Sequence, residues 1–140
     1  MVDKLAPVLA VTMGDPAGVG PEVIVRALAD ATVREGARPV VFGDRHVLDA
    51  ATAVTGAVVP WQVVRDAKAA ADPGIAASGR VALVDMNMVD PTSWAWGRLS
   101  AAHGKAALAY LYGAMQAVDD GFAAGLVTAP INKEATTLAG

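Results

Sequence analysis

Three polar side chains lie close together near the end of the sequence, in the segment "VTAPINKEA" at residues 127–135: Thr128, Asn132 and Lys133. A hydroxyl, an amide and an ammonium group can jointly hold a carboxylate or a phosphate, because lysine supplies a point charge and the other two groups supply directional hydrogen bonds. The same residues have a local interpretation, in which Thr128 ends a strand, Asn132 caps a helix and Lys133 is solvated. Taken by themselves, they favour the local interpretation over a ligand site.

A glycine-rich segment near the N-terminus is the second candidate site. In "VTMGDPAGVGPEVIV", residues 11–25, an apolar run stops at Gly14 and a new apolar pattern begins shortly afterwards. Gly18 and Gly20 would allow a ligand to approach the backbone, and free N–H groups at a helix start near Pro21 would point at an anion. The spacing G-x3-G-x-G is neither the dinucleotide fingerprint nor the phosphate loop. A tight strand-to-helix connection explains it equally well, so both interpretations stay open.

Both segments depend on the elements around them, and short apolar runs alternate with helical patterns along the chain. Five strands are expected, at residues 5–13, 38–43, 57–64, 80–86 and 125–129. Helices are expected at residues 21–30, 45–55, 100–123 and 133–138. Pro60 places the third strand at a sheet edge, whereas the last strand is expected to be short and buried. The segment 65–79 is expected to be a surface excursion in which a short helix could form.

Three helices carry more specific expectations. Asp44 is expected to cap the second helix, and Gly56 is expected to end it. One face of the first helix is expected to contain Val23, Ile24, Ala27 and Leu28. Apolar residues of the longest helix recur at spacings of three and four, so one face is expected to contain Leu108, Leu111, Met115, Val118 and Phe122.

Other side chains with chemical potential give weaker signals. Trp94 and Trp96 stand in the segment 87–100, which is rich in turn formers, and packing within this loop is favoured over a pocket or a subunit interface. His46 and His103 follow predicted helix starts, and nothing places them at metal-ligand spacing. The chain therefore shows no metal site of its own.

Composition narrows the class of protein. A length of 140 residues with 54% hydrophobic residues is typical of one α/β domain at 1–140. A net charge of -3, with eleven scattered Lys and Arg, argues against nucleic-acid binding, and the sequence offers no membrane-spanning run. Zero cysteines exclude disulfides and thiolate metal ligands, and agree with a cytoplasmic setting.

The alternation of strands and helices predicts the fold class. It indicates an α/β protein with a three-layer architecture, in which helices cover both faces of a mixed or parallel sheet. Ligands of such sheets bind at the carboxyl ends of the strands. Both candidate segments directly follow a predicted strand, so both are expected at that edge.

Two sequence segments resemble a known family. "TMGDPAGVGPEV" at 12–23 and "VTAPINKEA" at 127–135 together resemble the signatures of the 4-hydroxythreonine-4-phosphate dehydrogenase family of pyridoxal phosphate biosynthesis. The segment "SAAHGKAALAYLYGAMQAV" at 100–118 is similar to the family's long helix. The resemblance covers essentially the whole chain but less than half of the family's usual length. It implies an isocitrate/isopropylmalate-dehydrogenase-like fold, of which this chain would be the N-terminal part of a longer two-lobed enzyme.

The resemblance also implies a reaction. The family oxidises and decarboxylates 4-phosphooxy-L-threonine to 3-amino-2-oxopropyl phosphate, with NAD or possible NADP as oxidant and a divalent metal such as zinc, magnesium or cobalt. It works as a cytoplasmic homodimer with the active site between subunits. Relatives act on 4-phospho-threonate or erythronate, or on a terephthalate dihydrodiol, and a non-catalytic metabolite-binding fragment is a further alternative.

The resemblance assigns roles to few residues of this chain. Gly18, Gly20, Thr128 and Asn132 would bind substrate, and Lys133 would be a catalytic residue that faces the substrate or relays a proton. The family's metal ligands and most of its cofactor contacts would lie after residue 140. The 140-residue chain is therefore expected to be catalytically incomplete on its own.

Overall fold

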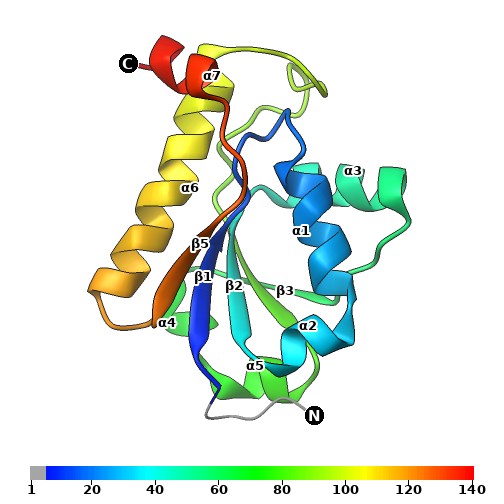
Figure 1. The fold of residues 1–140 in the computed structure, drawn as a ribbon, viewed down its shortest axis with the longest axis vertical. Coiled ribbons are helices and arrows are strands. Elements are labelled where there is room, and N and C mark those ends of the chain that lie inside the picture. The colour runs from blue at the N-terminus through cyan, green and yellow to red at the C-terminus, as the bar shows by residue number, and fades with distance from the viewer. Residues whose placement is uncertain (1–5) are drawn as a thin grey trace.

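Five strands form one parallel sheet in the computed structural model, which describes residues 6–140 (Figure 1). They are β1 (Val8–Thr12), β2 (Arg38–Gly43), β3 (Trp61–Val64), β4 (Val81–Asp85) and β5 (Gly125–Thr128). Their order across the sheet is β3-β4-β2-β1-β5, and every neighbouring pair is parallel. All five predicted strands are confirmed, although the first residue of the first predicted strand, Leu5, lies outside the described residues.

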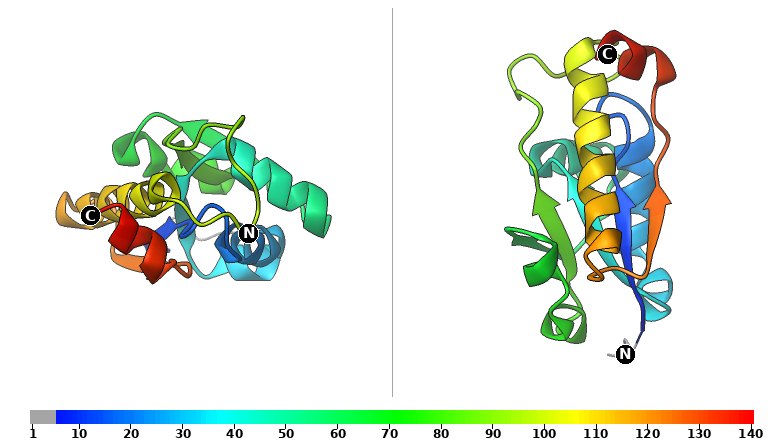
Figure 2. Two further views of the ribbon diagram at one scale, coloured as in Figure 1. Left: turned by 90° about the horizontal axis from the view of Figure 1, so that it is seen from above. Right: turned by 90° about the vertical axis from the view of Figure 1, so that its left-hand side faces the viewer.

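Helices cover both faces of this sheet, as predicted. They are α1 (Gly20–Ala29), α2 (Ala31–Glu35), α3 (Arg45–Thr55), α4 (Ala67–Ala70), α5 (Pro73–Ala77), α6 (Ala101–Asp119) and α7 (Lys133–Leu138). Helices α1 and α3 pack together on one face, whereas α4 and α6 lie on the other (Figures 1 and 2). The connections through α1 and α3 lead from β1 towards β3, whereas the connection through α6 leads back from β4 to β5. Because such connections are right-handed, a reversal of direction places α6 on the opposite face of the sheet.

The position of each strand in the sheet decides its burial. The central strands β2 and β4 contribute fully buried side chains such as Val41 and Leu83. β3 is an edge strand, as Pro60 in the predicted strand 57–64 indicated, and it begins directly after this proline. The expectation that β5 is buried is wrong: Leu126 is 39% exposed and Val127 45% exposed, because β5 lies at the other edge and has β1 as its one neighbour among the described residues.

Helix α6 buries a different face from the predicted one. Its buried residues are mainly small: His103, Gly104, Ala106, Ala107, Tyr110, Ala114 and Ala117. The predicted face lies on the flank, where Leu108 and Leu111 are half-buried and Met115 is 44% exposed. Small side chains let the helix axis approach the sheet closely, so the alanines and not the large residues fill the narrow space between them. The helix also ends at Asp119, before Phe122.

The other helix predictions have mixed outcomes. In α1, Ile24 and Leu28 are buried as predicted, but Val23 and Ala27 are exposed and Val25 takes their place in the core. The left-handed residue after α3 is Gly56 (φ 73°), as predicted. The segment 65–79 forms the two short helices α4 and α5. Within residues 6–140, no helix has the length and apolar character needed to cross a lipid bilayer.

Candidate functional site

The two predicted segments meet where the strand order reverses. From β1 the chain crosses to β2 on one side, and β5 later joins β1 on the other side. The last paired residues of β1 and β5 are Thr12 and Thr128, so the loops that follow these strands start side by side at the carboxyl edge (Figure 1). Such a switch point is the usual place for a ligand crevice in an open α/β sheet.

Backbone contacts join the two loops tightly. The N–H of Asp15 donates to the carbonyl of Pro130 at 3.0 Å. Gly14 has a φ of 75°, and a Cβ at this position would overlap the Pro130 carbonyl. A Cβ at Gly20 would overlap the carbonyl of Met13. The glycines therefore allow a tight connection between β1 and α1, which is the local interpretation of this segment. The loop also lies against the segment after β5, so it borders the switch point.

The glycine-rich loop is internally ordered, and the helix after it has an uncapped start. Asp15 is 9% exposed, and its carboxylate accepts the N–H of Ala17 at 2.9 Å. Gly18 packs above this carboxylate, since an added Cβ would lie 3.2 Å from its Oδ2. No side chain caps α1 at Val19, and Pro21 has no N–H to satisfy. The start of α1 can accept an anion, although the nearby Asp15 carboxylate opposes one electrostatically.

The polar residues of the second segment lie in two places, at the end of β5 and at the start of helix α7. Thr128 ends β5 with an exposed side chain. Asn132 caps α7, because its Oδ1 accepts the N–H of Ala135 at 3.1 Å, so its local role is confirmed. Its amide N–H groups are not used by that bond. Lys133 is exposed at the first position of α7 and forms no ion pair within residues 6–140. Hydroxyl, amide and ammonium thus lie along one edge, from the switch point to the helix start.

A third segment also reaches this edge, and nothing in the sequence indicated that it would. Residues 87–100, which we call the strap, pass beside the glycine-rich loop. The N–H of Gly97 donates to the carbonyl of Ala17 at 2.7 Å, and the indole Nε1–H of Trp94 donates to the carbonyl of Pro16 at 2.8 Å. Trp94 also packs edge-to-face against Trp96, with 4.7 Å between ring centroids, so packing within the loop is confirmed.

The prediction that Asp44 caps helix α3 is wrong. Its side chain makes no cap hydrogen bond, and the first N–H of the helix, at Arg45, donates instead to Asp85 Oδ1 at 3.1 Å. Asp44 is completely buried and accepts the N–H groups of Met88 at 2.9 Å and Val89 at 2.7 Å. The one signal in the sequence was its position, directly after a buried strand, where side chains point into the carboxyl-end crevice.

The third donor to Asp44 comes from helix α6. The hydroxyl of Tyr110 donates to Asp44 Oδ1 at 2.9 Å, and Tyr110 is itself fully buried. Burial raises the pKa of Tyr110 far above its ordinary value, and the negative charge of Asp44 raises it further. The phenol therefore keeps its proton and stays a hydrogen-bond donor.

Residues 35–140 match the family described as pyridoxal phosphate biosynthetic protein PdxA. The chain belongs to this family. Similar proteins include the D-threonate 4-phosphate dehydrogenase of Cupriavidus necator, 36% identical over 129 residues, and the 4-hydroxythreonine-4-phosphate dehydrogenase of Trichlorobacter lovleyi, 36% identical over 134 residues. The alignments cover 92% and 96% of this chain, but 37% and 39% of the relatives, so the chain spans less than two fifths of their length.

A solved structure agrees with this assignment. The 4-hydroxythreonine-4-phosphate dehydrogenase from Burkholderia phymatum is 36% identical and superposes with a TM-score of 0.85, covering 96% of this chain and 39% of that one. The sheet therefore has the isocitrate/isopropylmalate-dehydrogenase-like fold of PdxA proteins, as the sequence predicted. The two segments that resemble the family's signatures are the ones that meet at the switch point.

The part of this PdxA family member that the structure describes does not fit a metal ion. Among residues 6–140, no three His, Cys, Asp or Glu side chains lie close enough together to bind one. His103 is buried, and its Nδ1 lies 2.9 Å from the carbonyl of Arg98. His46 lies beside Trp94, and its Nδ1 is 3.9 Å from Asp44. Each histidine ring thus has one polar contact, to a carbonyl or to Asp44, and is not grouped with other side chains that could bind a metal.

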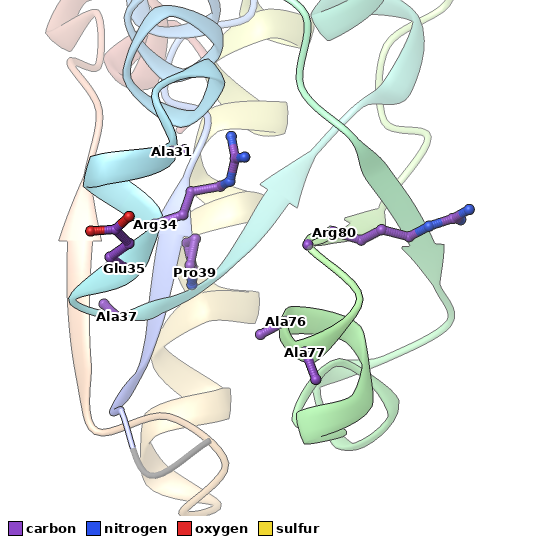
Figure 3. A pocket seen from close by; sticks show the side chains of 9 residues that line it. Ala31, Arg34, Glu35, Ala37, Pro39, Ala76, Ala77 and Arg80 are labelled. Carbon is purple, nitrogen blue, oxygen red and sulfur yellow. The ribbon is translucent and has the colours of Figure 1, made fainter. Parts of the chain in front are cut away.

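Two surface hollows of the PdxA chain differ in their relation to the switch point. One, of about 290 Å³, is an apolar groove between α1, β1 and β5 that reaches Thr128 and Pro130. The other, of about 190 Å³, lies at the opposite end of the sheet (Figure 3). There Arg34 donates to the carbonyl of Leu28, whereas Arg80 points away from the hollow (Figure 3). Their charges do not converge, so this second hollow is not an anion site.

Proposed function

We propose that the whole protein is an NAD-dependent dehydrogenase of a hydroxy acid that carries a phosphate on C4. The observation that carries this proposal is the meeting, at the switch point of the sheet, of the two segments that resemble the family's signatures. The relatives that support it are named for 4-phosphorylated substrates, 4-hydroxythreonine 4-phosphate and D-threonate 4-phosphate. Both contain a secondary alcohol at C3, between the carboxylate-bearing carbon and the phosphate-bearing carbon.

The proposed reaction has two steps. A hydride leaves C3 of the substrate for NAD, and the proton of the C3 hydroxyl goes to a base, so the alcohol becomes a ketone. The product of this step is a β-keto acid. It loses CO2 as the C1–C2 bond breaks, the electrons of that bond form an enolate with the C3 ketone, and C2 of the enolate then takes up a proton. From 4-phosphooxy-L-threonine the product would be 3-amino-2-oxopropyl phosphate. NADP would accept the same hydride.

Within this proposal, the described residues bind the anionic groups of the substrate. The uncapped first turn of α1, which begins at Gly20, and the polar groups of Thr128 and Asn132 would donate hydrogen bonds to a phosphate or carboxylate. Gly18, whose own N–H is bonded to the carbonyl of Asp15, would let the ligand approach the backbone closely. Lys133 would supply the compensating positive charge, or relay a proton from the substrate hydroxyl. The divalent metal that the resemblance implies finds no ligand cluster among residues 6–140, and none of these roles depends on it.

The two named substrates remain separate candidates because the relatives named for them are equally similar to this chain, at 36% identity. They differ at C2, where one carries an ammonium group and the other a hydroxyl. A dihydrodiol of terephthalate has no phosphate, so it would not use a phosphate site. The test is NADH formation by the full-length protein with each of the three compounds, alongside thermal shift. A ligand at 100 times its Kd stabilises by about 2.7 kcal/mol.

Lys133 gives this test a matched pair of variants. Lys133→Met removes a charged donor and is expected to raise the KM for the phosphorylated substrate about ten-fold or more, as loss of a charged hydrogen bond does. Lys68→Met removes another exposed charge, on α4 beside the C-terminal end of α6 and away from the loops after β1 and β5, and is expected to leave KM unchanged. Equal KM values for the two variants would contradict the role of Lys133, and a lack of turnover with all three compounds would favour a non-catalytic binding protein.

A further inference from the structure

The strap, residues 87–100, holds two consecutive peptide groups of the glycine-rich loop. The carbonyl of Pro16 accepts the indole N–H of Trp94, and the N–H of the same peptide group, on Ala17, donates to Asp15 Oδ1 at 2.9 Å. The carbonyl of Ala17 accepts the N–H of Gly97, and the N–H of that peptide group, on Gly18, donates to the carbonyl of Asp15 at 3.1 Å. A peptide group is planar, so fixing its N–H and its C=O fixes the orientation of the whole unit.

These two peptide groups come directly before the start of helix α1. Their orientation sets the direction of the backbone that enters the helix at Gly20. The N–H groups of this first turn have no side-chain cap, so their direction is what an incoming anion would meet. Without the strap, the carbonyls of Pro16 and Ala17 would lose their protein donors, and the loop would keep only the bonds it makes to itself and to Pro130.

The beginning of the strap is anchored in the core. Asp44 is completely buried, and its carboxylate accepts the N–H groups of Met88 and Val89 together with the hydroxyl of Tyr110. A buried carboxylate is costly without hydrogen-bond donors, so this anchor resists the departure of the strap. The strap enters through Asn87, which has a φ of 48°, an uncommon conformation for a residue other than glycine.

Aromatic packing aims the donor of Trp94. Its ring meets Trp96 edge-to-face at 4.7 Å and His46 at 6.2 Å between centroids, with interplanar angles of 70° and 88°. These two contacts restrict the indole ring, whose N–H is directed at the carbonyl of Pro16. Hydrogen bonds therefore tie the beginning of the strap to Asp44 and Tyr110, and tie its later residues Trp94 and Gly97 to the glycine-rich loop.

We propose that Trp94 is a positioning residue: through its bond to Pro16, and with Gly97, it holds the glycine-rich loop in the one arrangement that presents the start of α1 to the anionic group of the substrate. The substrate part of this inference rests on the function proposed above. The inference that the strap holds the glycine-rich loop does not depend on that function. Preorganisation of this kind lowers the cost of binding, so its loss appears mainly in KM.

The experiment compares two tryptophan-to-phenylalanine variants of the full-length protein. Trp94→Phe keeps an aromatic ring for the packing but removes the N–H that Pro16 accepts. Trp61→Phe is the control, because the Nε1–H of Trp61 is buried on β3 and donates to no acceptor within residues 6–140. In Trp94→Phe we expect faster hydrogen exchange in the peptide covering 14–20, and a KM for the phosphorylated substrate about three- to ten-fold higher with kcat within about two-fold. Trp61→Phe is expected to change neither quantity.

Each outcome decides a different part of the inference. Unchanged exchange at 14–20 in Trp94→Phe would overturn the holding of the loop by the strap. Faster exchange together with an unchanged KM would overturn the positioning role of Trp94. An absence of turnover in the unmodified protein would count against the proposed function, and the exchange result would still test whether the strap holds the loop. If Trp94→Phe does not fold, exchange of the unmodified protein in low denaturant replaces it. Segments 14–20 and 87–100 should then open together, and protection of 14–20 after 87–100 has opened would refute the inference.

Discussion

Small residues decide how closely the elements around the site can approach each other. The clearest case is Gly104 in the first turn of α6, where an added Cβ would overlap the carbonyl of Ala135 on α7. Helix α7 begins with Lys133 and is capped by Asn132. The absence of a side chain at Gly104 therefore fixes the distance between α6 and the helix that carries two of the candidate site residues.

Substitution of this glycine should displace helix α7. Gly104→Ala is expected to lower the free energy of unfolding by about 1–3 kcal/mol, because the overlap is with backbone atoms, which cannot rotate away as a flexible side chain can. Gly36→Ala is the control, since a Cβ there meets nothing within 4 Å and its φ of -86° suits any residue. Urea unfolding of the 140-residue polypeptide measures both, and equal stabilities would show that α7 does not pack on Gly104.

The buried phenol of Tyr110 should give the protein an alkaline limit. Burial and the charge of Asp44 raise the pKa of Tyr110 above its ordinary value of 10.0, so the folded state keeps a proton that the unfolded state loses above about pH 10. The unfolded state then binds fewer protons, and the free energy of unfolding falls by about 1.4 kcal/mol per pH unit from this group. Below pH 10 the contribution is fully present.

Two tyrosine variants isolate this contribution. Tyr110→Phe should lack the extra loss of stability above pH 10, and at neutral pH it should be less stable by about 1–3 kcal/mol, because Asp44 loses a donor. Tyr112→Phe should keep the wild-type pH profile, since Tyr112 is 62% exposed. Denaturant unfolding between pH 8 and 11 is the measurement, and parallel profiles for the wild type and Tyr110→Phe would contradict the argument.

At the scale of elements, helix α6 shows that the buried face of a helix need not be its most apolar face. Alanines pack against the sheet, while the larger Leu108, Leu111 and Met115 lie on its flank. The reason is geometric, because a helix that lies close to a sheet leaves room mainly for small side chains. The larger residues then form a partly exposed apolar stripe on the helix.

This arrangement predicts that substitutions at two neighbouring residues of α6 change stability by different amounts. Ala114 is completely buried, so Ala114→Leu should cost about 1–3 kcal/mol through overpacking. Met115 is 44% exposed, so Met115→Gln should change stability by less than about 0.5 kcal/mol in the 140-residue polypeptide. Thermal unfolding of both variants is sufficient. A larger loss with Met115→Gln than with Ala114→Leu would mean that the originally predicted face is the buried one.

At the scale of the whole molecule, the order of strands should make the free energy of local opening differ from strand to strand. β2 and β4 are paired on both sides, whereas β5 is paired on one side within the described residues and carries exposed Leu126 and Val127. Hydrogen exchange of the 140-residue polypeptide should give opening free energies at least about 2 kcal/mol lower for β5 than for β2. Equal protection of the two strands would show that β5 is covered in solution by something else, such as a second copy.

Much of the architecture could be predicted from the sequence because it depends on local patterns. The strands at residues 38–43 and 80–86, the helix at 45–55 and its glycine stop were all visible as apolar runs, helical periodicity and turn residues. The two candidate segments were found for a similar reason. Each directly follows a strand, and parallel strands bring their carboxyl ends to one edge whatever their order.

What the sequence could not show depends on which elements become neighbours. Burial of β5 and the buried face of α6 were predicted from hydrophobicity alone, but the strand order left β5 at an edge and close packing selected the alanine face of α6. Asp44 was expected to bond the next N–H groups along the chain. It instead reaches Met88, Val89 and Tyr110, which are 44 to 66 residues away in the sequence. Local patterns determined the elements and the edge where a ligand would bind, whereas contacts between distant segments, which periodicity does not encode, decided how that edge is held together.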